Sequence, residues 1–268
     1  MEYGLGTPML DCFRRDEVTR DLKVLAAQGG VAPRRLEQLG ILMLLSSDSD
    51  TEIKQTAEQT LQNLPTKVVA DFIARADVPT ELREFFVKRG ISPSDTPAPD
   101  SDDPLIDTAS LEQELAGATT EEEKTQTFQQ RLSSMTVPEK VKCATKGTRE
   151  MRAILIRDPN RMVSAAVLSC PKVNDAEIEA FCKMGNVSED ILRSISKSRG
   201  WTKDYAVVLA LVKNSKTPVA ITMNLMQRLN EGDVKKLASD RNVPEALRLA
   251  ARKRNVKIQT GGKRGTME

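Results

Sequence analysis

Four stretches of the C-terminal half follow one pattern: Asp158-Pro-Asn-Arg-Met-Val163, Asn186-Val-Ser-Glu-Asp-Ile191, Asn214-Ser-Lys-Thr-Pro-Val219 and Asn242-Val-Pro-Glu-Ala-Leu247. Each begins with Asp or Asn, has an apolar residue five places later, and starts 28 residues after the previous one. Further helix-start signals at Asn174, Thr202 and Asn230 repeat with the same period. Two helix starts in each period predict stacked helical hairpins, so we expect an all-α fold of the α-solenoid type.

Several polar residues of this repeat are expected to cap helices. Asn174 with Glu177 has the spacing of a capping box, and Asn230 with Asp233 has the same spacing. Thr217 precedes a proline, which is typical of a hydroxyl cap before the first helical position. Asn186 and Asn242 are expected to bond to the backbone of the turn between helices. The predicted structural caps are Asn174, Asn186, Thr217, Asn230 and Asn242.

The first 90 residues carry the same pattern more loosely. Apolar residues from Val18 to Leu25 lie at helical spacing before a Gly-Gly stop, and Pro33 opens a second helix that runs to Leu45. Asp48 and Asp77 each precede an apolar residue by five places. We expect about five helices between residues 14 and 89.

A change of composition divides the chain. Residues 91–118 are rich in Pro, Ser and Asp and nearly free of large apolar side chains, which predicts a flexible acidic linker. The run of acidic residues after Thr119 looks like a helix start. The predicted parts are an N-terminal helical-repeat segment at 1–90, the linker at 91–118, a C-terminal helical-repeat domain at 119–256 and a basic tail at 257–268.

The composition suits many short helices and a cytoplasmic protein. Aromatic residues make up only 3 % of the chain. The longest apolar runs, 41–45 and 206–212, are too short to cross a bilayer, so no membrane association is expected. The N-terminal residues show no signal-peptide pattern. The four cysteines form no CxxC pair and are expected to be reduced core residues.

Residues suited to catalysis are scarce. The sequence contains no histidine, the commonest general base and a common metal ligand. It has no glycine-rich phosphate loop between a strand and a helix, and no Ser or Cys nucleophile can find a histidine partner. We therefore predict no catalytic, cofactor-binding or metal-binding residues and a protein that is not an enzyme. A carboxylate pair assembled from distant helices is the catalytic arrangement left open.

Charge is distributed unevenly along the chain. Residues 1–132 contain 14 Lys and Arg against 24 Asp and Glu, a net charge of −10, whereas residues 133–268 contain 26 against 14, a net charge of +12. Such polarity could steer a partner or drive self-association through the opposite charges of the two halves. Ordinary solvated faces that differ in charge explain it equally well.

A basic residue directly precedes the Asp or Asn in three of the four repeats: Arg157, Lys213 and Arg241. Stacked repeats would align these residues as a candidate partner-binding ridge for phosphates or an acidic protein. The favoured interpretation is that each complements the dipole of the preceding helix. Trp201, the single tryptophan, is expected to pack over a helix start, with a binding hot spot as the alternative.

The stretches 157–160, 213–219 and 242–247 resemble those of short HEAT-like and leucine-rich-repeat-variant α-solenoids, especially a group of uncharacterised bacterial proteins with Asn-Val-Pro-Glu helix starts. The resemblance covers residues 136–255 and, more loosely, 14–89. Ser215 stands where that group tends to have proline. The resemblance implies a scaffold or adaptor in a bacterium, with no chemistry to transfer.

Two functions fit these patterns. The first is a scaffold that binds an unknown protein partner through a solenoid face. The alternative is a nucleic-acid-binding solenoid that uses the basic half, although few aromatic side chains are present to stack on bases. An enzyme of the DNA-repair type ranks third because no catalytic set can be named.

Overall fold

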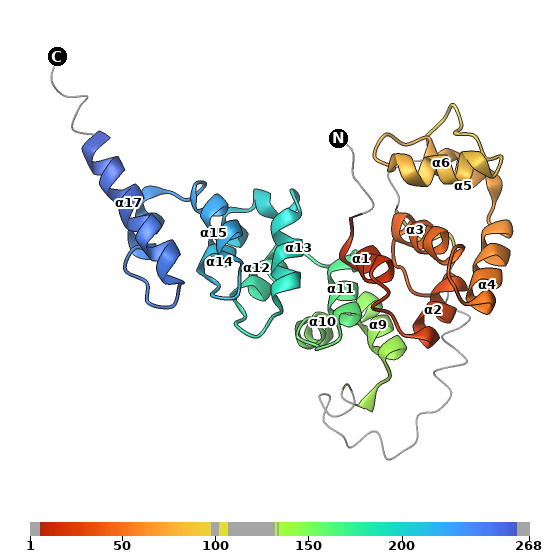
Figure 1. Ribbon diagram of the computed structural model, residues 1–268, viewed down its shortest axis with the longest axis horizontal. Helices are drawn as coiled ribbons and strands as arrows, with labels where there is room; N and C mark the ends of the chain where they lie inside the picture. Colours follow the sequence, from red (N-terminus) through yellow and green to blue (C-terminus); the bar gives the residue numbers. More distant parts are fainter. Residues whose placement is uncertain (1–5, 98–101, 107–131, 133, 262–268) are drawn as a thin grey trace. The chain divides into compact units, whose positions relative to one another are not determined.

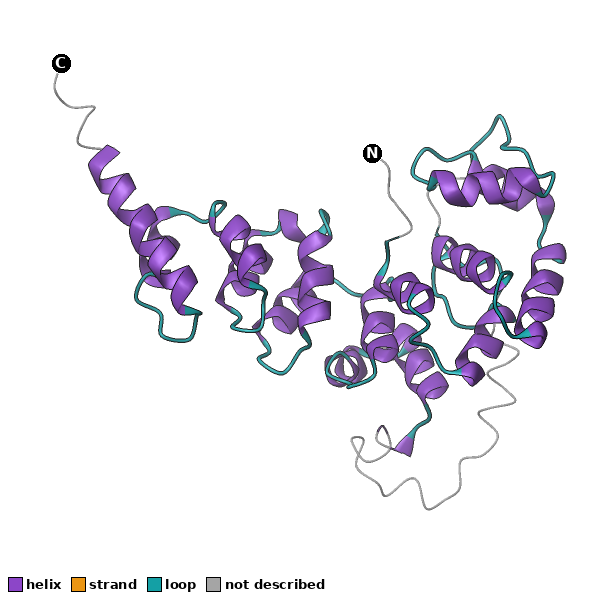
Figure 2. Cartoon of the chain, viewed as in Figure 1, coloured by secondary structure: helices purple, strands orange, loops and turns teal. Residues whose placement is uncertain are grey.

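The protein is helical, with no strand in the described part of the chain (Figure 2). The computed structural model describes residues 6–97, 102–106, 132 and 134–261, with side chains up to residue 256. The predicted all-α class is therefore confirmed. The chain forms two compact units, unit 1 (Met1–Pro171) and unit 2 (Lys172–Glu268). Among the described residues, no helix is both long and apolar enough to cross a membrane.

Unit 1 begins with six helices and continues with three more after the segment that is not described (Figure 1). They are α1 (Pro8–Arg14), α2 (Arg20–Ala27), α3 (Arg35–Leu45), α4 (Thr51–Gln62), α5 (Thr66–Ile73), α6 (Thr80–Lys88), α9 (Val137–Lys146), α10 (Arg149–Leu155) and α11 (Arg161–Ser169). The five helices expected between residues 14 and 89 correspond to α2 to α6. Helix α1 was not predicted, although its start has a hydroxyl cap at Thr7 and a proline at the first helical position.

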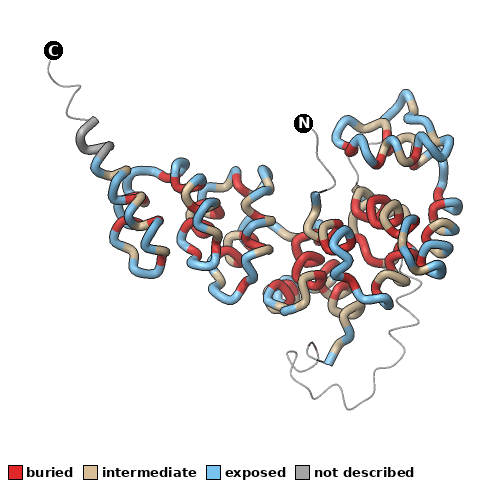
Figure 3. The backbone as a smooth tube through the Cα atoms, viewed as in Figure 1, coloured by how far each residue is buried: buried red, intermediate tan, exposed pale blue. Residues whose placement is uncertain are grey.

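Helix α11 of unit 1 is buried along most of its length (Figure 3). It contacts α9 on one side and α1 on another, while α2 contacts α9. A helix buried all round needs cover from several neighbours, and α11 receives it from α1, α9 and α10. This grouping differs from the predicted domains, which assigned α9 to α11 to a C-terminal domain at 119–256.

The loops before α4 and α11 share one hydrogen-bonding pattern. In the first loop, the carboxylate of Asp48 accepts from the backbone N–H of Asp50 at 2.9 Å, and Asp50 accepts from the N–H two residues further on at 3.0 Å. In the second, Asp158 accepts from the N–H of Asn160 at 2.8 Å, and Asn160 accepts in the same way at 2.9 Å. Two successive turns of this kind place the fifth residue inside the new helix, which explains the repeated Asp-to-apolar spacing.

A lysine from a neighbouring helix reaches the first carboxylate of each loop. Lys23 Nζ of α2 lies 2.9 Å from Asp48 Oδ2, and Lys140 Nζ of α9 lies 3.0 Å from Asp158 Oδ2. Burial raises the pKa of Asp48, but the N–H of Asp50 and the Lys23 ammonium outweigh it and leave the pKa below its usual range. The turn and the ion pair together fix α2 against α4 and α9 against α11.

Glu37 is a buried carboxyl group where α1, α3 and α11 meet. Its side chain is 1 % exposed and accepts a hydrogen bond of 2.6 Å from the Ser169 hydroxyl. Its second oxygen, Oε2, has no hydrogen-bond partner. Burial raises the pKa of Glu37, while Ser169, Arg34 and the Thr7 hydroxyl act against the rise. The carboxyl group therefore favours its protonated form more strongly in the folded protein than in the unfolded chain.

Glu37 should make unit 1 less stable as the pH rises. A carboxyl group whose folded pKa is raised costs no stability below its unfolded value of 4.5, and its penalty grows as the pH rises through the folded pKa. The free energy of unfolding can be measured with urea at pH 5, 7 and 9 for wild type and for Glu37→Gln. Between pH 5 and pH 9 the variant should lose less of this free energy than wild type, by about 1–3 kcal/mol. Parallel pH profiles for the two proteins would contradict this assignment.

Unit 2 is a series of short helices (Figure 1). They are α12 (Asp175–Lys183), α13 (Glu189–Lys197), the 3₁₀ turn η2 (Trp201–Lys203), α14 (Tyr205–Lys213), α15 (Val219–Met226), α16 (Glu231–Leu237) and α17 (Glu245–Gly261). Helix α12 packs on α14, α14 on α15, and both α15 and α16 pack on α17. Each helix therefore buries its apolar face against elements close to it in the sequence.

Two helix starts in unit 2 lie where the sequence places them. Asn174 Oδ1 accepts from the N–H of Glu177 at 2.9 Å at the start of α12, and Glu177 completes the capping box. Asn230 Oδ1 accepts from the N–H of Asp233 at 2.8 Å at the start of α16. The helix start predicted at Thr202, between these two, lies two residues later, because Asp204 is the N-cap of α14. Thr202 lies instead within η2, where its hydroxyl donates to the carbonyl of Ser198.

The other three predicted caps are not the N-cap residues of their helices. Asn186 is exposed, and Ser188 is the N-cap of α13. Thr217 is buried and its hydroxyl has no hydrogen-bond partner, because Pro218 is the N-cap of α15 and the helix begins one residue later than expected. Asn242 is exposed, and its backbone N–H donates to the Asp240 carboxylate.

Asn214 performs the bridging role that was expected of Asn186 and Asn242. Its buried side-chain amide donates to the carbonyls of Cys182 and Met184 at 2.8 and 3.0 Å. Its Oδ1 accepts from the N–H of Lys216 at 2.9 Å. One side chain thus satisfies carbonyl groups at the end of α12 and shapes the turn that follows α14.

Replacement of Asn214 with Ala should therefore destabilise unit 2. The variant leaves two carbonyls and one N–H without their partners, which costs roughly 1–3 kcal/mol. The matched control is Asn186→Ala, an exposed position where a change within about 0.5 kcal/mol is expected. Chemical unfolding of the two variants measures the difference. Equal effects would show that the Asn214 bonds contribute little.

Parts of the predicted linker and tail have defined structure. In the linker 91–118, the N–H of Ser94 donates to the carbonyl of Ala70, and residues 102–106 hydrogen-bond to α3. Helix α17 continues to Gly261, within the predicted tail 257–268. The helix start expected after Thr119 lies outside the described residues.

Candidate functional site

A groove lies between α12 and α14 in unit 2. It has a volume of about 340 Å³ and lies where the two helices pack together. Its lining comes from both helices: Glu179, Cys182, Lys183, Ala206, Leu209, Ala210, Lys213 and Asn214. Leu209 and Ala206 are both half-buried beside the groove.

Small side chains on α14 create the space. Ala206 and Ala210 are one helical turn apart. The residues that correspond to Ala206 one repeat earlier and later are Ile178 and Val234, and both are fully buried. Because an alanine leaves unfilled the volume that these larger residues occupy, α14 has a hollow beside α12. This difference between repeats is a sequence signal that could have located the groove.

The groove combines an apolar floor with basic residues at one end. Cys182 and Ala210 are buried beneath it. Lys183 and Lys213 are the last residues of α12 and α14, where the helix dipole favours a positive charge. Lys183 Nζ also lies 2.6 Å from Glu179 Oε1, one turn back on the same helix. A ligand that carries an apolar side chain with an acidic group beside it would match this apolar floor and these basic residues.

The thiol in the groove is not a ready nucleophile. Burial, with a smaller contribution from the Glu179 charge, raises the pKa of Cys182 to about 12. Burial likewise raises the pKa of Cys12 in unit 1 to about 11. Within the described residues, no cluster of three side chains that could hold a metal ion is found.

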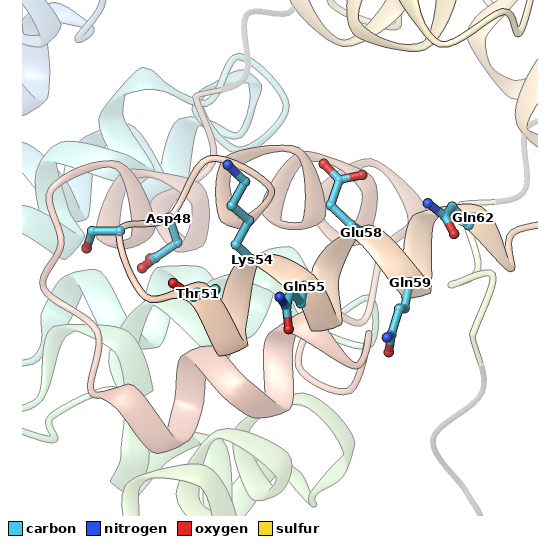
Figure 4. A pocket seen from close by; sticks show the side chains of 8 residues that line it. Asp48, Thr51, Lys54, Gln55, Glu58, Gln59 and Gln62 are labelled. Atoms are coloured by element: carbon cyan, nitrogen blue, oxygen red, sulfur yellow. The ribbon is translucent and has the colours of Figure 1, made fainter.

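A second hollow lies along the exposed side of α4 (Figure 4). It measures about 480 Å³, and its lining is polar: Asp48, Ser49, Thr51, Lys54, Gln55, Glu58, Gln59 and Gln62. Lys54, Gln55, Gln59 and Gln62 are all exposed to solvent. Because no buried apolar residue lines this hollow, it has the character of an ordinary solvated helix face.

The structure divides the predicted basic ridge between the two units. Arg157 belongs to unit 1, where its Nε donates to the carbonyl of Ala153 at 3.0 Å near the end of α10. Lys213 lines the groove, and Arg241 is exposed in the loop before α17. Trp201 is half-buried in η2 and does not line the groove. Of the four candidate residues, the groove thus contains only Lys213.

Other arginines of unit 2 bind the carbonyl groups at helix ends. Arg252 Nε donates to Ala238 O at 3.0 Å, and Arg254 donates to Met226 O and Leu229 O. Arg228 donates to Thr202 O. These guanidinium groups satisfy backbone acceptors that the short helices leave open. Part of the positive charge of unit 2 therefore has a structural role.

Comparison with protein-family models, curated proteins and solved structures found no match to the chain.

The cysteines provide a test of the packing around the groove. At pH 8 a thiol with a pKa near 12 is deprotonated in about one molecule in ten thousand, so Cys182 should react slowly in the folded protein. Cys143 is only half-buried and should be labelled first. Labelling with an aromatic disulfide, mapped by mass spectrometry, should show at least a tenfold difference in rate that disappears in urea. Rapid labelling of native Cys182 would mean that α12 and α14 separate readily.

Proposed function

We propose that the protein is a non-catalytic helical-repeat scaffold that binds a partner protein through the groove between α12 and α14. The observation that carries this proposal is the pairing of an apolar floor at Cys182 and Ala210 with the basic side chains of Lys183 and Lys213. A groove of about 340 Å³ accommodates one or two apolar side chains of a bound segment.

The packing of unit 2 supports a repeat architecture with a period of 28 residues. The Tyr205 hydroxyl donates to Asp233 Oδ2 at 2.6 Å and accepts from the N–H of Asn230 at 3.2 Å. These bonds join the start of α14 to the start of α16, and Tyr205 and Asp233 are 28 residues apart. Successive helix pairs that contact mainly their neighbours form an α-solenoid, whose extended faces are suited to protein binding.

The charges of the groove favour a partner segment that is apolar and acidic. An apolar side chain placed against Leu209 would lose contact with water, and a carboxylate beside it could reach Lys213. Charge complementarity of this kind accelerates association and disfavours basic segments. The expected partner sequence therefore has Asp or Glu next to a large aliphatic residue.

A photoreactive amino acid at position 209 tests the proposal in the full-length protein. Crosslinking in an extract of the source cell should yield a discrete protein adduct that survives nuclease treatment. Lys213→Glu in the same chain should reduce its yield at least tenfold, because the replacement repels an acidic segment. The matched control places the photoreactive group at Leu249, an exposed residue of α17, where the adduct should be absent.

The charge of unit 2 supports the alternative, a nucleic-acid-binding solenoid. Unit 2 contains 19 Lys and Arg against 11 Asp and Glu, a net charge of +8. The crosslinking experiment separates the two proposals. An adduct that nuclease abolishes, together with binding that weakens steeply as salt rises, would favour nucleic acid over a protein partner. Equal adducts at positions 209 and 249 would contradict the groove itself.

A further inference from the structure

A short acidic segment of the chain, residues 102–106, is bound to the start of α3. The carbonyl of Asp102 accepts from the N–H of Arg35 at 2.8 Å, and its carboxylate accepts from the N–H of Leu36 at 3.4 Å. Arg34, the N-cap residue of α3, makes no side-chain cap bond. Asp102 therefore caps α3 from a position 66 residues away in the sequence.

A buried glutamine holds the other end of the segment. Gln38 is 2 % exposed, and its Oε1 accepts from the N–H groups of Leu105 and Ile106 at 2.7 and 3.3 Å. Its Nε2 donates to the carbonyls of Ile106 and Gly29 at 3.3 and 2.9 Å. A side-chain amide that pairs with main-chain groups can bind a peptide whatever side chains the paired residues carry. Because a buried amide without partners is costly, Gln38 favours an occupied site.

Gly29 leaves room for the last side chain of the segment. A Cβ atom added to Gly29 would lie 2.6 Å from Ile106 Cδ1, closer than two carbon atoms can approach. Gly29 also has a φ of +84°, a conformation that glycine adopts easily. The isoleucine is therefore seated directly over the glycine, and the site selects an aliphatic side chain at this place.

Basic residues favour the acidic end of the segment. Arg35 Nε donates to the carbonyl of Asp103 at 3.0 Å. Burial raises the pKa of the Asp102 carboxyl group, while the N–H of Leu36 and the charges of Arg34, Arg75 and Arg35 act against the rise and favour the carboxylate. The N-terminus of α3 adds its partial positive charge. The site thus discriminates by charge at one end and by shape at the other, four residues apart.

We propose that Gly29, Arg34, Arg35, Leu36 and Gln38 form a recognition site for short peptides with the pattern Asp-x-x-x-aliphatic, and that residues 102–106 occupy this site as an internal competitor. A partner protein with the same pattern displaces the internal segment. The segment is exchangeable because each of its five residues is half-buried or exposed, and it contributes no side chain to the core. This site belongs to unit 1 and does not depend on the function proposed for the groove.

Competition within the chain sets the expected affinities. A tethered segment acts at an effective concentration of about 1 mM, so it suppresses the binding of a free peptide of similar intrinsic affinity. Weakening the internal segment should therefore reveal binding from solution. The appropriate receptor is the full chain with Asp102→Ala and Ile106→Ser, changes that leave every residue of the site intact.

Fluorescence anisotropy with a labelled peptide of sequence Asp-Asp-Pro-Leu-Ile tests the proposal. The doubly substituted chain should bind this peptide at least tenfold more tightly than wild type does. A peptide with Ala at its first position and Ser at its last should bind the same receptor at least tenfold more weakly. Because these comparisons leave the site residues unchanged, they do not depend on whether a site variant folds.

Two further receptors complete the experiment. Gln38→Ala in the doubly substituted chain should reduce peptide binding at least tenfold. Gln55→Ala, an exposed glutamine of α4, should leave it unchanged. Helical content measured by circular dichroism should be the same for both. The proposal is overturned if the peptide binds wild type and the doubly substituted chain equally, if the altered peptide binds as well as the native one, or if folded Gln38→Ala binds normally.

Discussion

The shortness of the helices is the constraint on which the rest of the structure depends. Most contain 7–12 residues, a length at which an isolated helix is marginal in water. Each must therefore be stabilised by burying an apolar face against its neighbours. The nine residues of α11 illustrate this, because the helix is buried along most of its length and contacts both α1 and α9. The low aromatic content fits such a core, in which small and branched side chains allow close approach.

Short helices also leave many backbone groups at their ends, and much of the polar sequence satisfies those groups. Paired turns such as Asp158 and Asn160 bond the N–H groups at helix starts. Asn214 and Arg254 bond the carbonyls at helix ends. The need to satisfy helix-end carbonyls also explains the role of Arg157, since its guanidinium group donates to a carbonyl of α10. A basic residue repeated in the sequence can thus mark a repeated structural requirement.

The sequence predicted features that are decided within a few residues. The starts at Asn174 and Asn230 depend on a side chain and an N–H three residues apart, so the local pattern located them. Thr217 failed as a cap because Pro218 moves the helix start by one residue, a shift that composition does not reveal. The place of α11 in unit 1 depends on α1, more than a hundred residues away. The groove depends on a difference between repeats at Ala206, which the pattern shared by the repeats does not show.

The acidic segment at 102–106 shows a different limit. Its Asp- and Pro-rich composition predicted a flexible linker, and these five residues hydrogen-bond to α3. Nothing in those five residues identifies the glutamine that holds them, because Gln38 reads their main chain and lies 67 and 68 residues earlier in the chain. Recognition through main-chain groups places little constraint on the side chains of the bound segment, so its sequence gives little indication of the site.

The contacts that close unit 1 have a consequence for the order in which the chain folds during synthesis. Unit 1 is joined by bonds between residues 132 and 144 positions apart, Ser169 with Glu37 and Arg161 with Glu17. Unit 2 is joined by bonds across shorter spans, such as the 32 positions between Asn214 and Cys182. Because distant pairings close slowly, the early helices of unit 1 wait with one side uncovered until α11 has been synthesised, whereas unit 2 can assemble pair by pair. The early helices of unit 1 are therefore in greater need of a chaperone than those of unit 2.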